Sequence, residues 1–75
     1  VSQIIELPDE KRVIKYRLRS FVLHVGETVL SGHYTAYVRA GDSYSFTHYN
    51  DETITEEAKI SGSIDNAYIY FYERI

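Results

Sequence analysis

Short runs of β-branched and aromatic residues, separated by turns rich in glycine and aspartate, dominate this sequence. Tyrosine and phenylalanine make up 15% of the chain, and its middle holds few strong helix formers. Such residues favour extended backbone, because their side chains pack well on a pleated surface. Short turns between the runs would place successive strands side by side and antiparallel. We therefore expect a mainly β chain, an antiparallel meander of four to five strands with little helix.

The expected strands follow from the positions of these runs. Residues 1–12 form an entry segment that could hold one short strand, and a turn is predicted at 8–11 around the only proline. Residues 12–25 carry a β-branched and aromatic series whose second half is almost continuously apolar, which predicts a strand buried on both faces. A loop bounded by glycines follows at 26–32. Further strands are predicted at residues 33–40, 44–49 and 67–72.

Residues 50–65, between the strands predicted at 44–49 and 67–72, have the least regular pattern. Residues 55–59 could form a helix of one or two turns with Thr55 as its N-cap, before Gly62 ends it. In the last strand, alternation places Tyr68, Tyr70 and Tyr72 on one side. These tyrosines are interpreted as core and sheet face rather than as a platform for stacking bases or sugars.

Composition narrows the classes of function. The chain has 44% hydrophobic residues and a net charge of −3, so it should form a packed core and lacks the basic field that holds nucleic acid. No apolar run is long enough to cross a bilayer, so we expect no membrane partner and a soluble, untargeted chain. With no cysteine, the chain contains no disulfide, thiolate zinc site or thiol nucleophile. No cofactor is expected.

A histidine that directly follows a glycine is the sharpest chemical feature of the sequence. His33 lies in the segment SGHYTAYV, at the start of a predicted strand, where it would be held more firmly than in a loop. Gly32 before it allows backbone or substrate to approach closely. Asn50 and Asp51 follow the next strand, so a hairpin could bring an acceptor side chain beside the imidazole.

Each of these residues also has a structural interpretation. A histidine in an apolar-flanked strand is more often a packed or surface residue than a catalytic base, and an asparagine–aspartate pair is more often a turn. His24 and His48 are interpreted as structural on pattern alone. A metal site built from His33, His48 and Asp51 has no ligand-spacing motif in its favour, so none is expected.

Four segments in order resemble the C-terminal part of the ubiquitin-specific protease family. YRLRSFVLHVG is similar to a strand of that family, and LSGHYTAYV is similar to its histidine box. YSFTHYNDET is similar to the stretch that carries the third residue of the catalytic triad, and AYIYFYER is similar to the closing strand. These segments are residues 16–26, 30–38, 44–53 and 67–74.

The resemblance implies a role for several residues. His33 matches the general base, Asn50 the residue that orients it, and Asp51 an often acidic position that assists by polarising water or the oxyanion region. His24, Gly32 and Tyr34 fall where the family lines its substrate cleft. Two departures stand out: Phe46 replaces the usual tryptophan, and the family's cysteine box is missing.

The resemblance further implies that residues 1–75 are the histidine-side, palm-like segment of a papain-like α+β cysteine protease fold. Its partners would be ubiquitin or a ubiquitinated protein and a companion polypeptide that carries the cysteine box. The activity implied is isopeptide hydrolysis in the cytoplasm and/or nucleus, with this chain inactive alone. Two alternatives stay open: a non-catalytic module that binds ubiquitin or a partner, and an unrelated β-domain that binds carbohydrate or peptide through its tyrosines.

Overall fold

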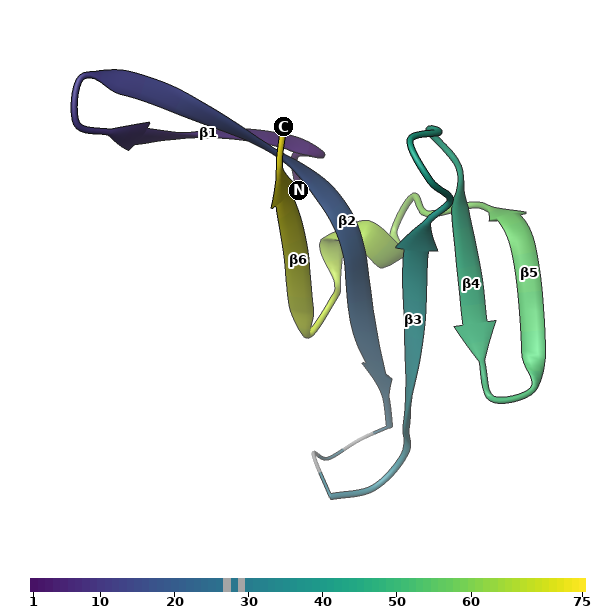
Figure 1. The fold of residues 1–75 in the computed structure, drawn as a ribbon. Coiled ribbons are helices and arrows are strands. Elements are labelled where there is room, and N and C mark those ends of the chain that lie inside the picture. The colour runs from purple at the N-terminus through teal and green to yellow at the C-terminus, as the bar shows by residue number, and fades with distance from the viewer. Residues whose placement is uncertain (27, 29) are drawn as a thin grey trace.

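A computed structural model describes residues 1–26, 28 and 30–75. These residues fold into one antiparallel sheet of six strands with a single short 3-10 helix (Figure 1). The mainly β expectation is therefore confirmed, with one strand more than the four to five predicted. The elements are β1 (Ile4–Asp9), β2 (Arg12–Val25), β3 (His33–Arg39), β4 (Phe46–Asn50), β5 (Thr53–Ala58), the 3-10 helix η1 (Ser63–Asp65) and β6 (Ile69–Arg74).

The long strand β2 organises the sheet. Strands β1 to β5 follow one another as a meander, and β6 returns to pair with β2. The first half of β2 pairs with β1 and its second half with β3, while β6 pairs with its middle. At Tyr16 and Arg17, β2 is paired with both β1 and β6, so these two strands lie on opposite edges of β2. The last strand, which would be prone to aggregation if left free, is thus paired.

A bulge in β2 gathers the core on one face. Side chains alternate along a regular strand, so Leu18 and Phe21 would point to opposite faces. The pairing with β6 shifts register between Leu18 and Ser20, and this irregularity turns both side chains to the same face. Both are fully buried, in a cluster with Tyr37, Phe46 and Ile64. We call the face that carries these residues the inner face.

The segment from Lys59 to Tyr68, which contains η1, covers the inner face. Ile64 packs into the core, the Tyr70 hydroxyl donates to the Ile64 carbonyl at 2.6 Å, and the Tyr37 and Ser63 hydroxyls lie 3.3 Å apart. Beneath it, the rings of Phe21, Tyr37 and His48 stack across three neighbouring strands, with centroids 4.8 and 4.1 Å apart. This stack fixes the register of β2, β3 and β4.

The opposite side of the sheet, the outer face, has no such cover among the described residues. The register places Val22, Ala36, Tyr49 and Ile54 in one row across β2 to β5. Val38, Ile69 and Phe71 share this face, because Ser20 pairs with both Val38 and Phe71, and Val22 pairs with Ile69. The prediction that β2 is buried on both faces is therefore wrong. Its buried residues are Ile14, Leu18 and Phe21.

Other local predictions also need correction. The helix expected at residues 55–59 is wrong, because Thr53–Ala58 forms β5, joined to β4 by a two-residue turn. A helix of one or two turns is marginal, whereas β-branched Thr53, Ile54 and Thr55 can pair with β4. The turn predicted at residues 8–11 is shorter, since Pro8 pairs with Val13 inside the β1–β2 hairpin. Of the loop at 26–32, positions 27 and 29 lie outside the described residues.

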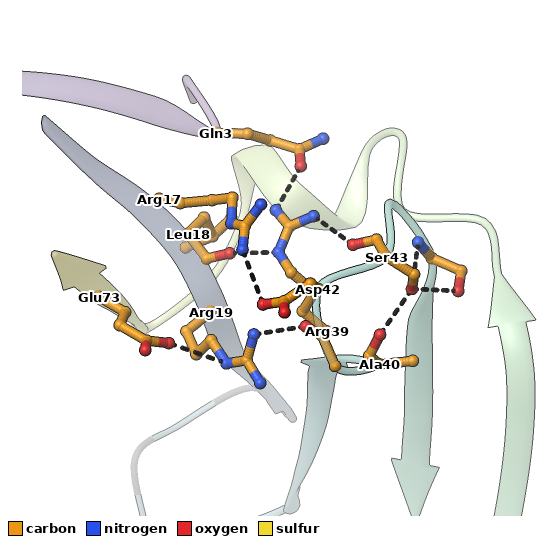
Figure 2. A network of polar contacts seen from close by, with 11 residues as sticks. Gln3, Arg17, Leu18, Arg19, Arg39, Ala40, Asp42, Ser43 and Glu73 are labelled. Atoms are coloured by element: carbon orange, nitrogen blue, oxygen red, sulfur yellow. Dashed lines mark hydrogen bonds and ion pairs between the residues drawn. The ribbon is translucent and has the colours of Figure 1, made fainter. Parts of the chain in front are cut away.

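Arg39 is buried beside the point along β2 where its pairing changes from β1 to β3 (Figure 2). Only 2% of Arg39 is exposed, and its guanidinium donates to the Leu18 and Ser43 carbonyls and to the Gln3 side chain, at 2.7–2.9 Å. It also lies 4.7 Å from the centre of the Phe46 ring. Burial, together with the charges of Arg17 and Arg19, lowers the pKa of Arg39. Leu18 lies at the point along β2 that pairs with neither β1 nor β3, and Arg39 supplies the donor for its carbonyl there.

In the part of the chain that the structure describes, no helix is long and apolar enough to cross a membrane. Likewise, none of the described residues form a group of three or more histidine, cysteine or acidic side chains able to hold a metal ion.

Candidate active site

His33 and Asn50 meet at one end of the inner face. His33 begins β3 and Asn50 ends β4, so the hairpin between them returns the chain to its starting edge. Tyr37 pairs with His48, and alternation from this pair places both His33 and Asn50 on the inner face. The His33 Nε2 and Asn50 Oδ1 atoms are 3.2 Å apart. The expected proximity of the imidazole and an acceptor is confirmed.

This contact assigns a hydrogen to one of the two ring nitrogens of His33. The Asn50 Oδ1 atom can only accept, so His33 Nε2 must be the donor and carry a hydrogen. The other ring nitrogen, Nδ1, is then free to accept a proton in the neutral ring. His33 is exposed, while the stacked Tyr37 and His48 rings hold the strands behind it. An accessible base with an oriented ring is the arrangement that nucleophile activation needs.

Asp51 occupies the turn beside this pair. It is exposed and has a φ of 53°, a left-handed conformation that aspartate tolerates better than most residues. Within the described residues its side chain makes no hydrogen bond that would tie it to His33. The structure therefore gives Asp51 a turn-forming position, and its assisting role stays a prediction.

Gly32 sits against backbone rather than an open cleft. Its φ is 102°, and a β-carbon built on it would lie 2.8 Å from the Gly26 α-carbon and overlap the Val25 carbonyl. The close approach expected at this glycine is thus made by the end of β2. A side chain here would push apart the strands that set the position of His33.

We expect Gly32→Ala to destabilise the chain by about 1–3 kcal/mol, because it combines a strained φ with a backbone clash. Gly41→Ala is the matched control, since Gly41 also has a positive φ, 59°, but no atom lies within 4 Å of its added β-carbon. Thermal unfolding of both variants tests this. Equal melting temperatures would show that the Gly32 contact has no consequence.

His24 and Tyr34 lie on the outer face at this same end of the sheet. They pair directly between β2 and β3, with ring centroids 4.9 Å apart. Tyr68 joins them, 6.1 Å from Tyr34, and its backbone N–H donates to the Val22 carbonyl. The prediction that Tyr68 shares a face with Tyr70 and Tyr72 is wrong, because its ring lies against Tyr34 while Tyr70 and Tyr72 pack on the inner cluster. We call His24, Tyr34 and Tyr68 the aromatic trio; Tyr34 and Tyr68 are exposed and His24 is half-buried.

Comparison with known proteins identifies the family of this chain. The family model described as "Ubiquitin carboxyl-terminal hydrolase" matches residues 2–72. The chain belongs to the ubiquitin carboxyl-terminal hydrolase family. The match covers β1 to β5 and the first four residues of β6, and so includes both strands that hold His33 and Asn50.

Curated relatives share this region at moderate identity. Ubiquitin carboxyl-terminal hydrolase 14 of Saccharomyces cerevisiae is 38% identical over 61 residues, covering 79% of this chain and 8% of the relative. Hydrolase 4 of Vanderwaltozyma polyspora is 38% identical over 74 residues, covering 93% and 8%. Human hydrolase 5 is 33% identical over 61 residues, covering 81% and 7%. No solved structure matches. The chain thus spans less than a tenth of the length of these relatives.

Two aromatic residues of the matched region, Phe46 and Tyr68, lie on different faces of the sheet. Phe46, which stands where the ubiquitin-specific proteases resembled by this chain usually have tryptophan, is 1% exposed and lies in the core with Phe21. The smaller ring therefore fills a core position. The position of Tyr68 on the outer face could not be predicted, because strand alternation continued from Tyr70 ignores that β6 begins only at Ile69.

Proposed function

We propose that this chain is the histidine-side, palm-like segment of a papain-like cysteine deubiquitinase, which hydrolyses isopeptide bonds at the ubiquitin C-terminus. The observation that carries the proposal is the contact between His33 Nε2 and Asn50 Oδ1 in a member of the ubiquitin carboxyl-terminal hydrolase family. The nucleophile comes from a companion polypeptide or another part of the same protein, because these residues include no cysteine.

In this reaction His33 moves the proton. Its Nδ1 atom takes the proton of the cysteine thiol, and the resulting thiolate attacks the carbonyl carbon of the isopeptide bond. The same nitrogen then protonates the leaving lysine amine, and water hydrolyses the thioester. Asn50 holds Nε2, so that Nδ1 faces the sulfur through both steps. An amide orients the imidazole without adding charge, which suffices where a thiolate and a protonated histidine form an ion pair.

The aromatic trio would contact the substrate. An extended ubiquitin tail that reaches the reacting carbonyl must pass this end of the sheet, where Tyr34 and Tyr68 present exposed rings beside the half-buried His24. Aromatic rings supply large contact area at small cost in conformational entropy. The partners are accordingly ubiquitin or a ubiquitinated protein. The thiol chemistry suits a reducing compartment, the cytoplasm and/or the nucleus.

A chimera tests this function. In it, the matched segment of the Saccharomyces cerevisiae hydrolase 14 is replaced by the whole of this chain, and release of a fluorophore from the C-terminus of ubiquitin is measured. We expect hydrolysis by the chimera and none by this chain alone. A folded chimera that binds ubiquitin without cleaving it would refute the proposal and favour the binding-module alternative.

A further inference from the structure

Strand β5 lies at the edge of the sheet, and one of its two sides has no strand partner in the described chain. The order of strands ends at β5, which pairs only with β4, and Figure 1 shows it at the rim of the sheet. Every residue of β5 except Ala58 is exposed. An edge strand presents a row of backbone N–H and C=O groups that can pair with another extended chain. This edge is therefore open to strand addition.

Acidic side chains set the charge of this edge. The β4–β5 hairpin, residues 46–58, contains no lysine or arginine and four acidic residues, Asp51, Glu52, Glu56 and Glu57. The ion pairs of the described chain include none of these four carboxylates. A second copy of β5 is a poor partner, because pairing two such strands brings like charges together. Charge complementarity favours a basic partner instead.

A bulge in β5 lies beside a hollow in the surface. The pairing of β4 with β5 shifts register between Phe46 and His48, so Glu56 and Glu57 both oppose the single residue Thr47. Glu57 has a φ of 50°, a left-handed conformation that few residues adopt. The adjoining hollow has a volume of about 320 Å³, and both glutamates line it. The bulge thus gathers two carboxylates around one opening at the edge of the sheet.

The lining of this hollow suits an ammonium or guanidinium group. Besides the two glutamates, Ala40, Ser45 and Thr47 line it. Carboxylate oxygens accept hydrogen bonds and hydroxyl oxygens can also accept them, whereas an ammonium or guanidinium group only donates. A lysine or arginine side chain that projects from a strand added to β5 would therefore find several acceptors here.

We infer that β5 recruits an extended, basic segment of a partner protein by strand addition. The backbone of the segment pairs with the free edge of β5, and a lysine or arginine side chain occupies the hollow at the bulge. Backbone pairing supplies affinity, and the acidic edge selects against acidic segments. Strand β4 separates this edge from His24 and Tyr34 on β2 and β3, so the recruitment surface is separate from the proposed contact with the ubiquitin tail.

Peptide binding tests this inference. The probes are fluorescein-labelled peptides of about nine residues in which threonine alternates with lysine or with glutamate, and fluorescence polarisation follows their titration with the whole chain. We expect the lysine peptide to bind at least about tenfold more tightly than the glutamate peptide.

Backbone methylation separates strand addition from attraction by charge alone. Two further lysine peptides carry N-methyl groups on alternate residues, one on the lysines and the other on the threonines. The N–H groups of alternate residues point to opposite edges of a strand, so only one of the two sets faces β5 when the lysines face the hollow. We expect one methylated peptide to lose at least about tenfold in affinity and the other to bind within about threefold of the unmethylated peptide.

A matched pair of variants tests the hollow. Glu57 and Glu10 are both exposed glutamates with a positive φ, 50° and 56°, and of the two Glu57 lines the hollow. We expect Glu57→Gln to weaken binding of the lysine peptide by at least about threefold and Glu10→Gln by less than about 1.5-fold. Circular dichroism shows whether each variant keeps the fold, and Glu56→Gln repeats the test at the second carboxylate.

Several results would overturn the inference: no binding of the lysine peptide by the wild-type chain, equal affinity for the two methylated peptides, or equal affinity of Glu57→Gln and Glu10→Gln. A chimera that fails to bind the lysine peptide would assign the edge to a segment of the host protein. A dimer in sedimentation velocity that Glu57→Gln strengthens would assign the edge to a second copy. The peptides are bound and not cleaved, so an inactive chimera bears on the proposed function alone.

Discussion

Replacing His33 with alanine is expected to lower the kcat/KM of the chimera by at least about a thousandfold, the range of a lost general base. Without the imidazole, the thiol loses its proton acceptor and the leaving amine loses its donor. The fold should be unaffected, because His33 is exposed and lies outside the inner cluster. Hydrolysis of a fluorogenic ubiquitin amide measures the effect.

Asn50→Ala supplies a graded comparison. It leaves the base in place and removes only the acceptor 3.2 Å from Nε2, so its effect should be smaller. We expect a loss on the order of tenfold to a hundredfold, as for other groups that orient a working histidine. Tyr44→Ala is the control, since Tyr44 is 92% exposed and lies in the β3–β4 turn. Wild-type activity of His33→Ala would remove His33 from the mechanism.

Replacing Arg39 with methionine is expected to destabilise the chain by about 2–4 kcal/mol, because it leaves the buried Leu18 carbonyl without a donor. The Gln3 and Ser43 contacts are lost as well, so the start of β1 and the β3–β4 turn are both released. For a chain of this size the melting temperature should fall by roughly 10–25 °C. Thermal or urea unfolding measures this.

Two variants separate the bonding pattern of Arg39 from its charge. Arg39→Lys keeps the charge but lacks the planar fork that reaches three acceptors, so it should recover only part of the stability. Arg12→Met removes an exposed arginine from the same sheet and should change stability by less than about 0.5 kcal/mol. An Arg39→Met chain as stable as Arg12→Met would show that the junction does not depend on this side chain.

Much of the sheet could be predicted from the sequence, because its strands coincide with β-branched and aromatic runs. Strands β2 and β3 begin at the residues expected, Arg12 and His33, and glycines mark the connection between the two strands. The faces were harder to predict. The bulge near Leu18 reverses the alternation of side chains along β2, and no local sequence pattern predicts the bulge. The same limit applies to Tyr68, whose orientation depends on where β6 begins.

The polar contacts likewise include one that the sequence predicts and a group that it does not. The His33–Asn50 contact follows from a glycine-preceded histidine at a strand start and an amide at the end of the returning strand, a relation that hairpin geometry makes local. Arg39 could not be recognised in advance. Its acceptors, Gln3, Leu18 and Ser43, come from three separate parts of the chain, and only the folded sheet brings them together.

The reactivity of the cysteine in the chimera tests most directly whether His33 acts on it. Alkylation of the cysteine that a ubiquitin electrophile modifies is followed by mass spectrometry across a range of pH. With His33 present, the thiol should titrate well below the ordinary value of about 8.5, and His33→Ala should return it toward that value. The same alkylation profile in the chimera and its His33→Ala variant would contradict the account.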